Sequence, residues 1–527
     1  MRDHRRGRVW VLVAAAWFAG LGSADAQRPP GSEAPPDREA PDKPPAAVDL
    51  DVPSDPDAWL PAADEKDAST RALQSLYDPG GLTSARAVEE VIRTSPDIRR
   101  TKALALEAKG GALQAMSTLV PRLEMRGTAN KLSNVQTAGI NSDANQEVID
   151  GLIDQLRTPD TPANQANQIL WDGLLGDSGF QFPALTNQYN LEAQMTYSFT
   201  ESLARSLPAY RAAKKNKEAA KQQYEAELNN VAFNAWEAYY EFARAKAGVG
   251  VANSAVESAE AQRSETAALV DGGAAARVDL MRVEAQLEAA KVSLANAELG
   301  FKVAQRSLQT LMHTDVVPTL GEDLSKPVRG IPNDTEAELY ERALQERPDL
   351  QALDTYVEAT QHQLRSANGG RAPDILVRGL AQYANPNFRV VPQQQRFQAT
   401  WEVGAVIQWA PNDTVNAQGR SRQLQADLER AYADVQALKD AIRVEVAEGY
   451  QGVVAATAAL KSARLGLTAA EEGYRVKREQ LQAGIVNTTD LLQAQTDLIR
   501  AQVDLVESAV GIRIAKAQLL RAVGERP

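Results

Sequence analysis

One stretch of the chain decides its fold and occurs twice, as DGGAAARVDLMRVEAQLEAAKVSLANAELGFKVAQRSLQTL (residues 271–311) and as QAGIVNTTDLLQAQTDLIRAQVDLVESAVGIRIAKAQLLRA (residues 482–522). Gly273 in the first copy corresponds to Gly484 in the second, and Asp279 corresponds to Asp490. After each aspartate, apolar residues recur at alternating steps of three and four. This spacing is typical of a long helix that packs lengthwise against other helices.

The composition excludes several classes of protein. The 527 residues carry a formal net charge of −12, so the chain offers no basic stripe for nucleic acid. It contains no cysteine, which excludes disulfides, thiolate chemistry and a lipid-modified N-terminal cysteine. His313 and His362 stand apart from each other and from clustered carboxylates, which predicts no metal site, and no cofactor is expected.

The N-terminal segment has the pattern of an export signal. Arginines precede an apolar run, which ends at Ala24-Asp25-Ala26, so residues 1–26 are predicted to be a signal peptide. Residues 27–82 are rich in proline and acidic residues and are predicted to be a flexible N-terminal arm. No later apolar run is long enough for a transmembrane helix, so any membrane-spanning part must be built of strands.

Strand patterns follow Pro121 and Pro373. Apolar and polar residues alternate from Tyr189 to Thr200 and again from Phe397 to Trp409. Twelve such residues tilted by about 40° would rise about 30 Å, close to the apolar band of a membrane barrel. A half-buried strand of a soluble protein is the alternative, but such strands are usually shorter. Residues 131–188 are predicted to be a large external loop.

The duplication predicts the domain organisation. Repeat 1 spans residues 83–312 and repeat 2 spans residues 335–524, with an equatorial linker at 313–334. Each repeat is expected to hold a helix, a strand pair and a long helical hairpin that turns at its glycines. The descending arms (201–270 and 413–482) are twice as long as the ascending arms (279–312 and 490–523). The short helices before the strands are therefore expected to stack end to end with the ascending arms.

A second apolar seam lies beside the main one in the last helix, at Ile499, Val503, Val506 and Val510. Two seams predict neighbours on both sides, which suits a cylinder of helices better than a dimeric coiled coil. Four strands with open edges cannot cross a membrane alone, so several copies are expected to close one barrel.

The sequence resembles the TolC-like outer membrane efflux proteins. The resemblance rests on the duplication, on Ser95-Pro96-Asp97-Ile98 with Arg347-Pro348-Asp349-Leu350, on the proline strand starts, and on the second hairpin turn, from Gln482 to Gln495. It covers about residues 83–524. It implies an α+β membrane fold, in which a homotrimer forms a 12-stranded β-barrel, four strands per chain, continued by a periplasmic α-helical barrel.

The resemblance also implies a function and a location. Such a protein is a passive outer membrane duct of a tripartite efflux or type I secretion system in a Gram-negative-type cell. It receives substrate from a periplasmic adaptor and an inner-membrane pump, and it contacts outer membrane lipid. Export by the signal peptide, without a lipid anchor, would bring it there.

The resemblance assigns roles to particular residues. Asp279 and Asp490 are expected near the periplasmic aperture, and the hairpin tips are expected to contact the adaptor through Gly272, Gly273, Gly484 and Ile485. Leu481 and Val486 stand where some relatives have a Tyr and Arg latch. The lipid-facing strand aromatics are expected to be Tyr189, Tyr197, Phe199, Phe397, Trp401 and Trp409.

Simpler alternatives accompany these assignments. Asp279 and Asp490 each follow a turn and precede a helix, so they could serve only as caps, and the glycines could serve only turn geometry. An enzyme is not expected, because the chain has no phosphate-binding loop, G-x-S-x-G or HExxH motif. A soluble periplasmic coiled-coil adaptor or scaffold shares the helical hairpin, but it does not predict four long two-faced strands.

Overall fold

The computed structural model describes residues 77–133 and 187–526, apart from 274, 333, 392 and 393, together with four isolated positions between 151 and 166. The predicted signal peptide, nearly all of the N-terminal arm and most of the 131–188 loop lie outside the described residues. The chain divides into two units, 1–54 and 55–527. Every described residue belongs to the second unit.

Short helices precede each strand pair. In repeat 1 these are α3 (Ser84–Thr94) and α4 (Pro96–Ser117), and in repeat 2 they are α9 (Glu336–Glu346) and α10 (Pro348–Gly369). The two members of each pair are separated by a single residue, because Pro96 and Pro348 have no amide hydrogen to continue the preceding helix and instead start the next. A capping box of Thr335 and Glu338 begins α9.

Two long hairpins make up most of the described residues. The first is a π-helical turn, η1 (Glu201–Ser206), continued by α7 (Leu207–Asp271) and then α8 (Arg277–Met312). The second is α11 (Pro411–Gln482) with α12 (Thr488–Val523). Each bound lies within two residues of its sequence expectation, except that the π-helical turn was not expected. At 1.5 Å per residue the 72 residues of α11 span about 108 Å.

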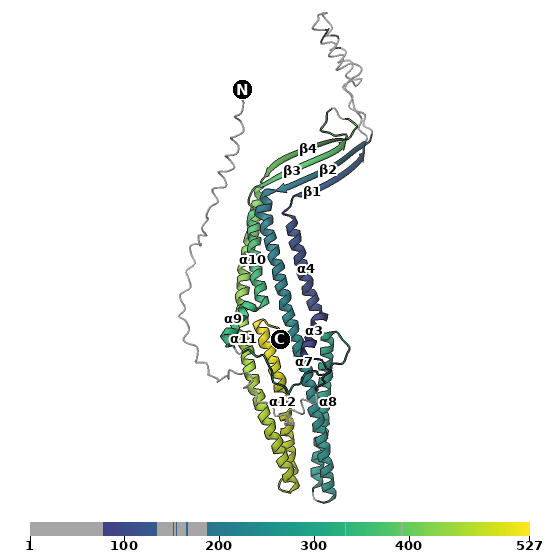
Figure 1. The fold of residues 1–527 in the computed structure, drawn as a ribbon, viewed down its shortest axis with the longest axis vertical. Coiled ribbons are helices and arrows are strands. Elements are labelled where there is room, and N and C mark those ends of the chain that lie inside the picture. The colour runs from purple at the N-terminus through teal and green to yellow at the C-terminus, as the bar shows by residue number, and fades with distance from the viewer. Residues whose placement is uncertain are drawn as a thin grey trace, which may run out of the picture. The chain divides into compact units, whose positions relative to one another are not determined.

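The short helices complete the half of each long arm that the ascending helix leaves uncovered, as the sequence predicted. Both α3 and α4 pack on α7 beyond the end of α8, and α9 and α10 pack on α11 beyond the end of α12 (Figure 1). Hydrogen bonds join the short helices to the ends of α8 and α12. Thr94 donates to the Met312 carbonyl over 3.3 Å, and Arg347 donates to the Ala522 carbonyl over 3.2 Å.

Four antiparallel strands form one sheet in the order β1 (Arg122–Lys131), β2 (Asn187–Ser198), β3 (Asp374–Asn385) and β4 (Gln398–Gln408). The sheet lies at one end of the long helices, and the two hairpin turns lie at the other (Figure 1). The register pairs Gly127 with Leu191, Leu191 with Tyr383, and Tyr383 with Ala399. Each strand thus presents its odd-numbered residues to the same face.

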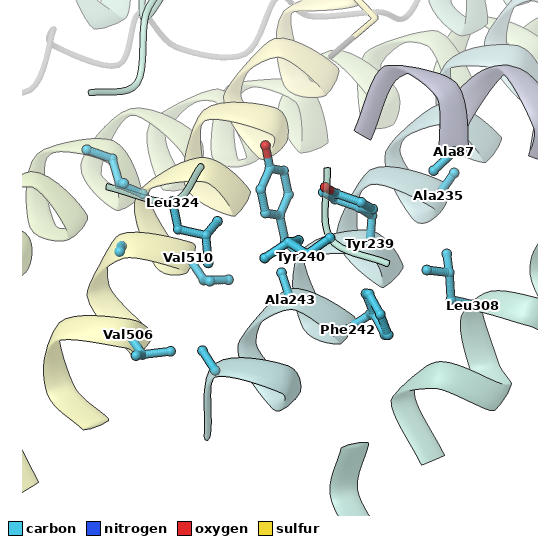
Figure 2. Packing of buried hydrophobic residues seen from close by; sticks show 14 of the residues in the cluster. Ala87, Ala235, Tyr239, Tyr240, Phe242, Ala243, Leu308, Leu324, Val506 and Val510 are labelled. Carbon is cyan, nitrogen blue, oxygen red and sulfur yellow. The ribbon is translucent and has the colours of Figure 1, made fainter. Parts of the chain in front are cut away.

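The main apolar core lies where α7 meets α3, α8 and α12. Tyr239 and Phe242 of α7 are fully buried, and Val506 and Val510 of α12 face α7 across the cluster (Figure 2). The predicted second seam of α12 is therefore a packing surface in its C-terminal part. Val503, which lies nearer the hairpin turn, is 37% exposed.

The equatorial linker is fastened by buried polar groups. Glu322 accepts hydrogen bonds from the Ser84 amide and hydroxyl and from the Tyr240 hydroxyl. Arg513 of α12 donates to the carbonyls of Leu324 and Lys326 over 3.2 and 2.8 Å. Burial lowers the pKa of Arg513 and raises that of Tyr240. Because a buried charge is stable only when it is partnered, these bonds hold the linker against α3, α7 and α12.

Candidate functional site

One face of the sheet is apolar along most of its length, with the polar residues Lys131, Asn187 and Asn385 only at the end away from the helices. Directly opposite residues of antiparallel strands share a face, so the register groups the odd-numbered residues of all four strands. Most of the large ones are exposed, including Met125 at 79% and Trp401 at 77%. The apolar residues of this face are Leu123, Met125, Gly127, Ala129, Tyr189, Leu191, Ala193, Met195, Tyr197, Ile375, Val377, Gly379, Ala381, Tyr383, Ala399, Trp401, Val403, Ala405 and Ile407. An exposed apolar surface of this kind marks an interaction with lipid or protein.

The opposite face is polar and carries paired charges. Glu124 pairs with Arg126 over 3.0 Å, and Glu402 pairs with Arg378 over 3.1 Å. Ser198 hydrogen-bonds Asp374 where β2 and β3 meet the helices. The apolar residues Leu376, Leu380 and Val406 interrupt this face. The sheet therefore separates an apolar side from a side that suits water.

Aromatic residues gather at both ends of the apolar face. Away from the helices, Phe397 stacks on Tyr383 with ring centroids 5.0 Å apart and lies 6.0 Å from Tyr189. At the helical end, Tyr197 and Phe199 meet edge to face at 4.8 Å. Phe199 and Phe397 lie one residue outside their strands, as does Trp409.

Tyr383 is an aromatic of this face that sequence reasoning missed. Its strand shows the same alternation, but Leu376 and Leu380 occupy the polar positions of β3 and weaken the pattern. Both outer edges of the sheet, on β1 and β4, have no partner strand among the described residues. Those edges present unpaired backbone groups.

The two hairpin turns share one backbone conformation. Gly273 and Gly484 both have a φ of +73°, a left-handed value that glycine adopts without strain. Their amides bond back to the carbonyls of Val270 and Leu481, which ends α7 and α11 in the same way. Both glycines therefore serve the geometry of the turn, which is the simpler of the two roles expected from the sequence.

The two aspartates beyond the turns differ in what they bind. Asp490 forms a capping box with Asn487, whose side chain accepts from the Asp490 amide over 2.9 Å. Ala276 stands at the same place in the first turn and provides no side-chain cap. Asp279 instead lies 3.5 Å from Arg282. The capping role is therefore present at Asp490, and the Asp279 carboxylate serves an ion pair.

Arg282 links the two hairpins. Its Nη1 lies 3.4 Å from the Thr489 hydroxyl of α12, and sequence reasoning had no signal for this contact. Leu481 and Val486 are both partly buried. Because their side chains are apolar, neither can form a polar latch. Three side chains from the two hairpins, Asp279, Arg282 and Thr489, thus come together at the tips.

His313 and His362 both lie within the described residues. No cluster of three or more potential ligands occurs in the part of the chain that the structure describes. His313 ends α8 in a left-handed conformation, and burial with nearby positive charges lowers the pKa of His362. None of the described helices is both long and apolar enough to cross a membrane.

Comparison with known proteins accords with the two-faced sheet and the paired hairpins. Residues 339–525 match the family described as outer membrane efflux protein. These residues therefore form an outer membrane efflux protein domain. The efflux protein domain runs from α9 to α12 and includes β3, β4 and the second hairpin turn. Repeat 1 is related to it by the internal duplication.

Individual relatives match about half of the chain in sequence and most of it in fold. Outer membrane efflux protein BepC of Brucella suis biovar 1 (strain 1330) is 24% identical over 263 residues, which is 49% of this chain and 55% of BepC. The aligned region thus spans about half of that relative. The outer-membrane channel OprN shares the fold with a TM-score of 0.66 at 18% identity, over 88% of this chain and 97% of OprN. The Campylobacter jejuni CmeC outer membrane channel gives 0.66 at 16% identity, over 88% and 93%. These relatives are described as channels or efflux proteins, and none as an enzyme.

Proposed function

We propose that the chain is one subunit of a trimeric outer membrane duct, which passively carries substrate to the cell exterior. The observation that carries this proposal is the register of the sheet, which collects apolar side chains on one face of all four strands. Lipid would cover that face, with aromatic residues at both of its ends, as in outer membrane barrels. The polar face would line a water-filled lumen that the helices continue.

The free edges explain why several copies are needed. Open sheet edges are not tolerated in lipid, because their backbone groups find no partner there. Pairing β4 of one copy with β1 of the next satisfies both edges and repeats around a ring. Three copies would close a barrel of 12 strands, and the number three follows the resemblance to TolC-like proteins.

The internal duplication supports the same assembly. In repeat 2, Val510 of α12 is buried against α7, and Arg521 stacks on Phe233 of α7 with the guanidinium 4.6 Å from the ring centre. The corresponding residues of repeat 1 are exposed, Leu299 of α8 at 62% and Val444 of α11 at 55%. We therefore infer that α8 packs on α11 of a second copy, as α12 packs on α7 within one chain.

The hairpin tips would form the periplasmic mouth. Asp279 and Asp490 would lie near the aperture, and Gly272, Gly273, Gly484 and Ile485 would contact a periplasmic adaptor that an inner-membrane pump supplies. Ile485 is 72% exposed, which suits a contact with a partner. The system would be a tripartite efflux or type I secretion system of a Gram-negative-type cell. The subunit would be exported by its signal peptide without a lipid anchor.

A soluble periplasmic adaptor is the alternative function. An adaptor could have the same helical hairpins as a duct subunit. In an adaptor, however, the exposed apolar face of the sheet would have to be covered by protein. Recovery of the full chain from the soluble periplasmic fraction would support the adaptor and contradict the duct. Recovery in the outer membrane is the expected result.

The decisive experiment measures mass and conductance together. The full-length protein, purified in detergent, is expected to have the mass of three chains by light scattering and to conduct ions in a planar bilayer. A non-conducting monomer would contradict the proposal.

Cross-linking tests how the barrel closes. The chain has no cysteine, so a pair can be introduced without removing any. A cysteine at Thr128 of β1 is combined in turn with one at each polar-face position of β4. One register is expected to yield covalently linked trimers, because neighbouring strands lie about 4.8 Å apart. The same β4 series with a cysteine at Asn190 of the interior strand β2 is the control and should give no links between chains.

A further inference from the structure

The first residues of the connection between β3 and β4, 386–391, cover the outer end of the polar face. Ala384 belongs to that face by its pairing with Asn190 and Gln398, and it is only 2% exposed. It is the one buried residue within the four strands as the structure describes them. Asn190 Oδ1, directly across from Ala384, is shielded from solvent and has no hydrogen-bond partner among the described residues. Since Pro386 and Asn387 are also buried, the connection lies against the sheet at this point.

Asn387 anchors the connection. Its side-chain amide donates to the Gln398 carbonyl over 3.1 Å and to the Thr400 hydroxyl over 3.0 Å. Its side-chain oxygen accepts from the Arg389 amide over 3.0 Å. The residue is 1% exposed, so all three bonds are largely protected from water. These bonds fix the connection to the first residues of β4. They also fix the position of the Arg389 backbone.

Arg389 reaches further along the polar face. Its guanidinium forms an ion pair with Glu402 and donates to the Trp401 carbonyl over 3.4 Å. Glu402 lies four residues into β4, about 13 Å from the start of the strand. The same carboxylate binds Arg378 of β3, so two arginines share one acid. The cluster of Arg378, Arg389 and Glu402 therefore carries a net positive charge.

We propose that residues 386–391 of this connection narrow the outer mouth of the duct, and that Arg389 determines which ions pass most readily there. The inference rests on the proposed function, because only in a closed barrel does the polar face line a lumen. Three copies would place three Arg389 side chains around one opening. Charges that line a narrow, water-filled opening concentrate the oppositely charged ion, so the mouth would favour anions.

The test compares two arginines of the same connection in the full-length protein in planar bilayers. Arg389→Ala is expected to raise the single-channel conductance and to shift the reversal potential in a salt gradient toward cations, by about twofold in permeability ratio. Arg396→Ala removes the same charge from the same connection without touching Glu402, and it should shift selectivity less. Arg389→Lys keeps the charge and should retain most of the wild-type selectivity.

Two further variants separate width from charge. Glu402→Gln leaves Arg378 and Arg389 without their acid, so the selectivity should move the opposite way, toward anions. Asn387→Ala changes no charge but releases the anchor, so the conductance should rise with little change in selectivity. Light scattering of each variant verifies that the trimer has formed, and the four other substitutions remain informative where Arg389→Ala does not assemble.

The outcomes distinguish this inference from the function on which it rests. A conducting wild-type channel in which Arg389→Ala and Arg396→Ala behave alike would overturn the mouth assignment alone. A wild-type protein that does not conduct would overturn the proposed duct and the mouth assignment together.

Discussion

Arg282 of α8 lies 3.4 Å from the hydroxyl of Thr489 in α12, so one side chain joins the tips of the two hairpins. The same guanidinium is 3.5 Å from Asp279, one turn earlier in its own helix. The corresponding residue of the second hairpin is Gln493, and it bonds Asp497 within α12. The duplicated turns are thus alike in backbone and different in the contacts that hold them.

Replacing Arg282 with alanine should loosen the tips. The side chain is 55% exposed, so we expect its contacts to contribute only about 0.5 kcal/mol, which is a two- to threefold change in the fraction of open channels. Planar-bilayer recordings of Arg282→Ala would show this as a higher open probability. Gln493→Ala is the matched control, because it alters the equivalent place without an inter-hairpin contact. Equal behaviour of the two variants would mean that Arg282 does not hold the tips closed.

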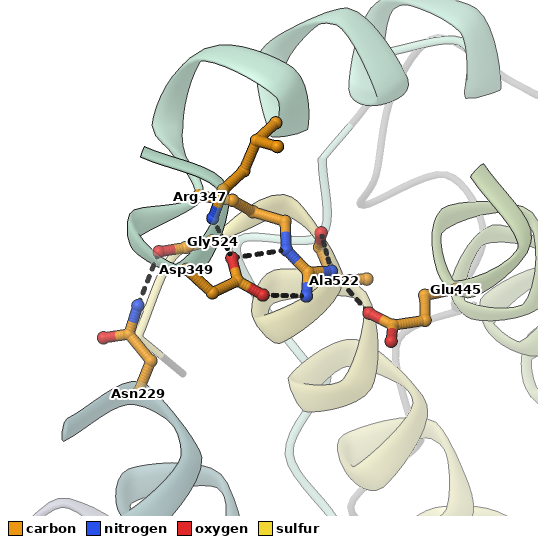
Figure 3. Close-up of polar contacts among 7 residues, drawn as sticks. Asn229, Arg347, Asp349, Glu445, Ala522 and Gly524 are labelled. Atoms are coloured by element: carbon orange, nitrogen blue, oxygen red, sulfur yellow. Dashed lines mark hydrogen bonds and ion pairs between the residues drawn. The ribbon is translucent and has the colours of Figure 1, made fainter. Parts of the chain in front are cut away.

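Arg347 joins α9, α10, α11 and the end of α12 (Figure 3). It binds Asp349 over 2.7 Å, pairs with Glu445, and donates to the Ala522 carbonyl. Its side chain is only 11% exposed. Arg347→Ala should lower the free energy of unfolding by about 2 to 4 kcal/mol, because it leaves partly buried acceptors without a partner. Denaturation in detergent, followed by circular dichroism, measures the loss. Arg475→Ala, which removes only the exposed ion pairs with Glu472 and Glu479, should leave the free energy of unfolding nearly unchanged.

The same site predicts an acid dependence of stability. Burial raises the pKa of Asp349, but the hydrogen bonds and charge of Arg347 outweigh it, so the pKa lies below its ordinary value. A lowered pKa stabilises the fold above the unfolded value of about 3.9, and this contribution disappears as the pH falls through the folded pKa. The loss of stability below about pH 4 should therefore be shallower in Asp349→Asn than in the wild type. An unchanged slope would exclude Asp349 as a contributor.

Local and repeated features of this fold could be predicted from the sequence. Pro96 and Pro348 mark the breaks between short helices, and Gly273 and Gly484 mark the turns, because each of these residues acts on its own backbone. Strands β2 and β4 were found because their alternation has few exceptions. The sequence offered Asp490 itself as a possible cap, whereas the structure makes Asn487 the cap and Asp490 its partner three residues later.

Contacts between distant segments could not be predicted in this way. The bond from Arg282 to Thr489 and the folding of Arg389 onto Glu402 depend on where two independent elements meet. Tyr383 was missed for a different reason, because Leu376 and Leu380 on the polar side of its strand hide the period of two. Sequence periodicity reports the average environment of a face, so it fails where individual residues depart from that average.

Gly449 allows α11 and α12 to approach closely. A Cβ added there would lie 3.0 Å from the Cα of Leu519 in α12, whereas a Cβ at Gly452 of the same helix would meet nothing within 4 Å. Gly449→Ala should destabilise the protein by about 1 kcal/mol, because overpacking outweighs the gain in helix propensity. Gly452→Ala should stabilise it by about 0.5 to 1 kcal/mol. Thermal unfolding of both variants in detergent measures the difference, and equal shifts would show that the helices do not pack at Gly449.

Tryptophan fluorescence tests whether the apolar face of the sheet contacts lipid. Trp401 lies within β4, three residues from its outer end, and Trp409 lies just beyond its helical end, about 20 Å from Trp401 along the barrel axis at a tilt of 40°. In vesicles of phospholipid brominated deep in the acyl chain, Trp401→Phe should remove most of the quenching. Trp409→Phe should instead reduce quenching by bromine placed near the headgroups. Trp236→Phe is the control, since Trp236 packs against Tyr240 in the helical core with ring centroids 5.6 Å apart. If all three variants are quenched like the wild type, the exposed face of the sheet is not in the membrane.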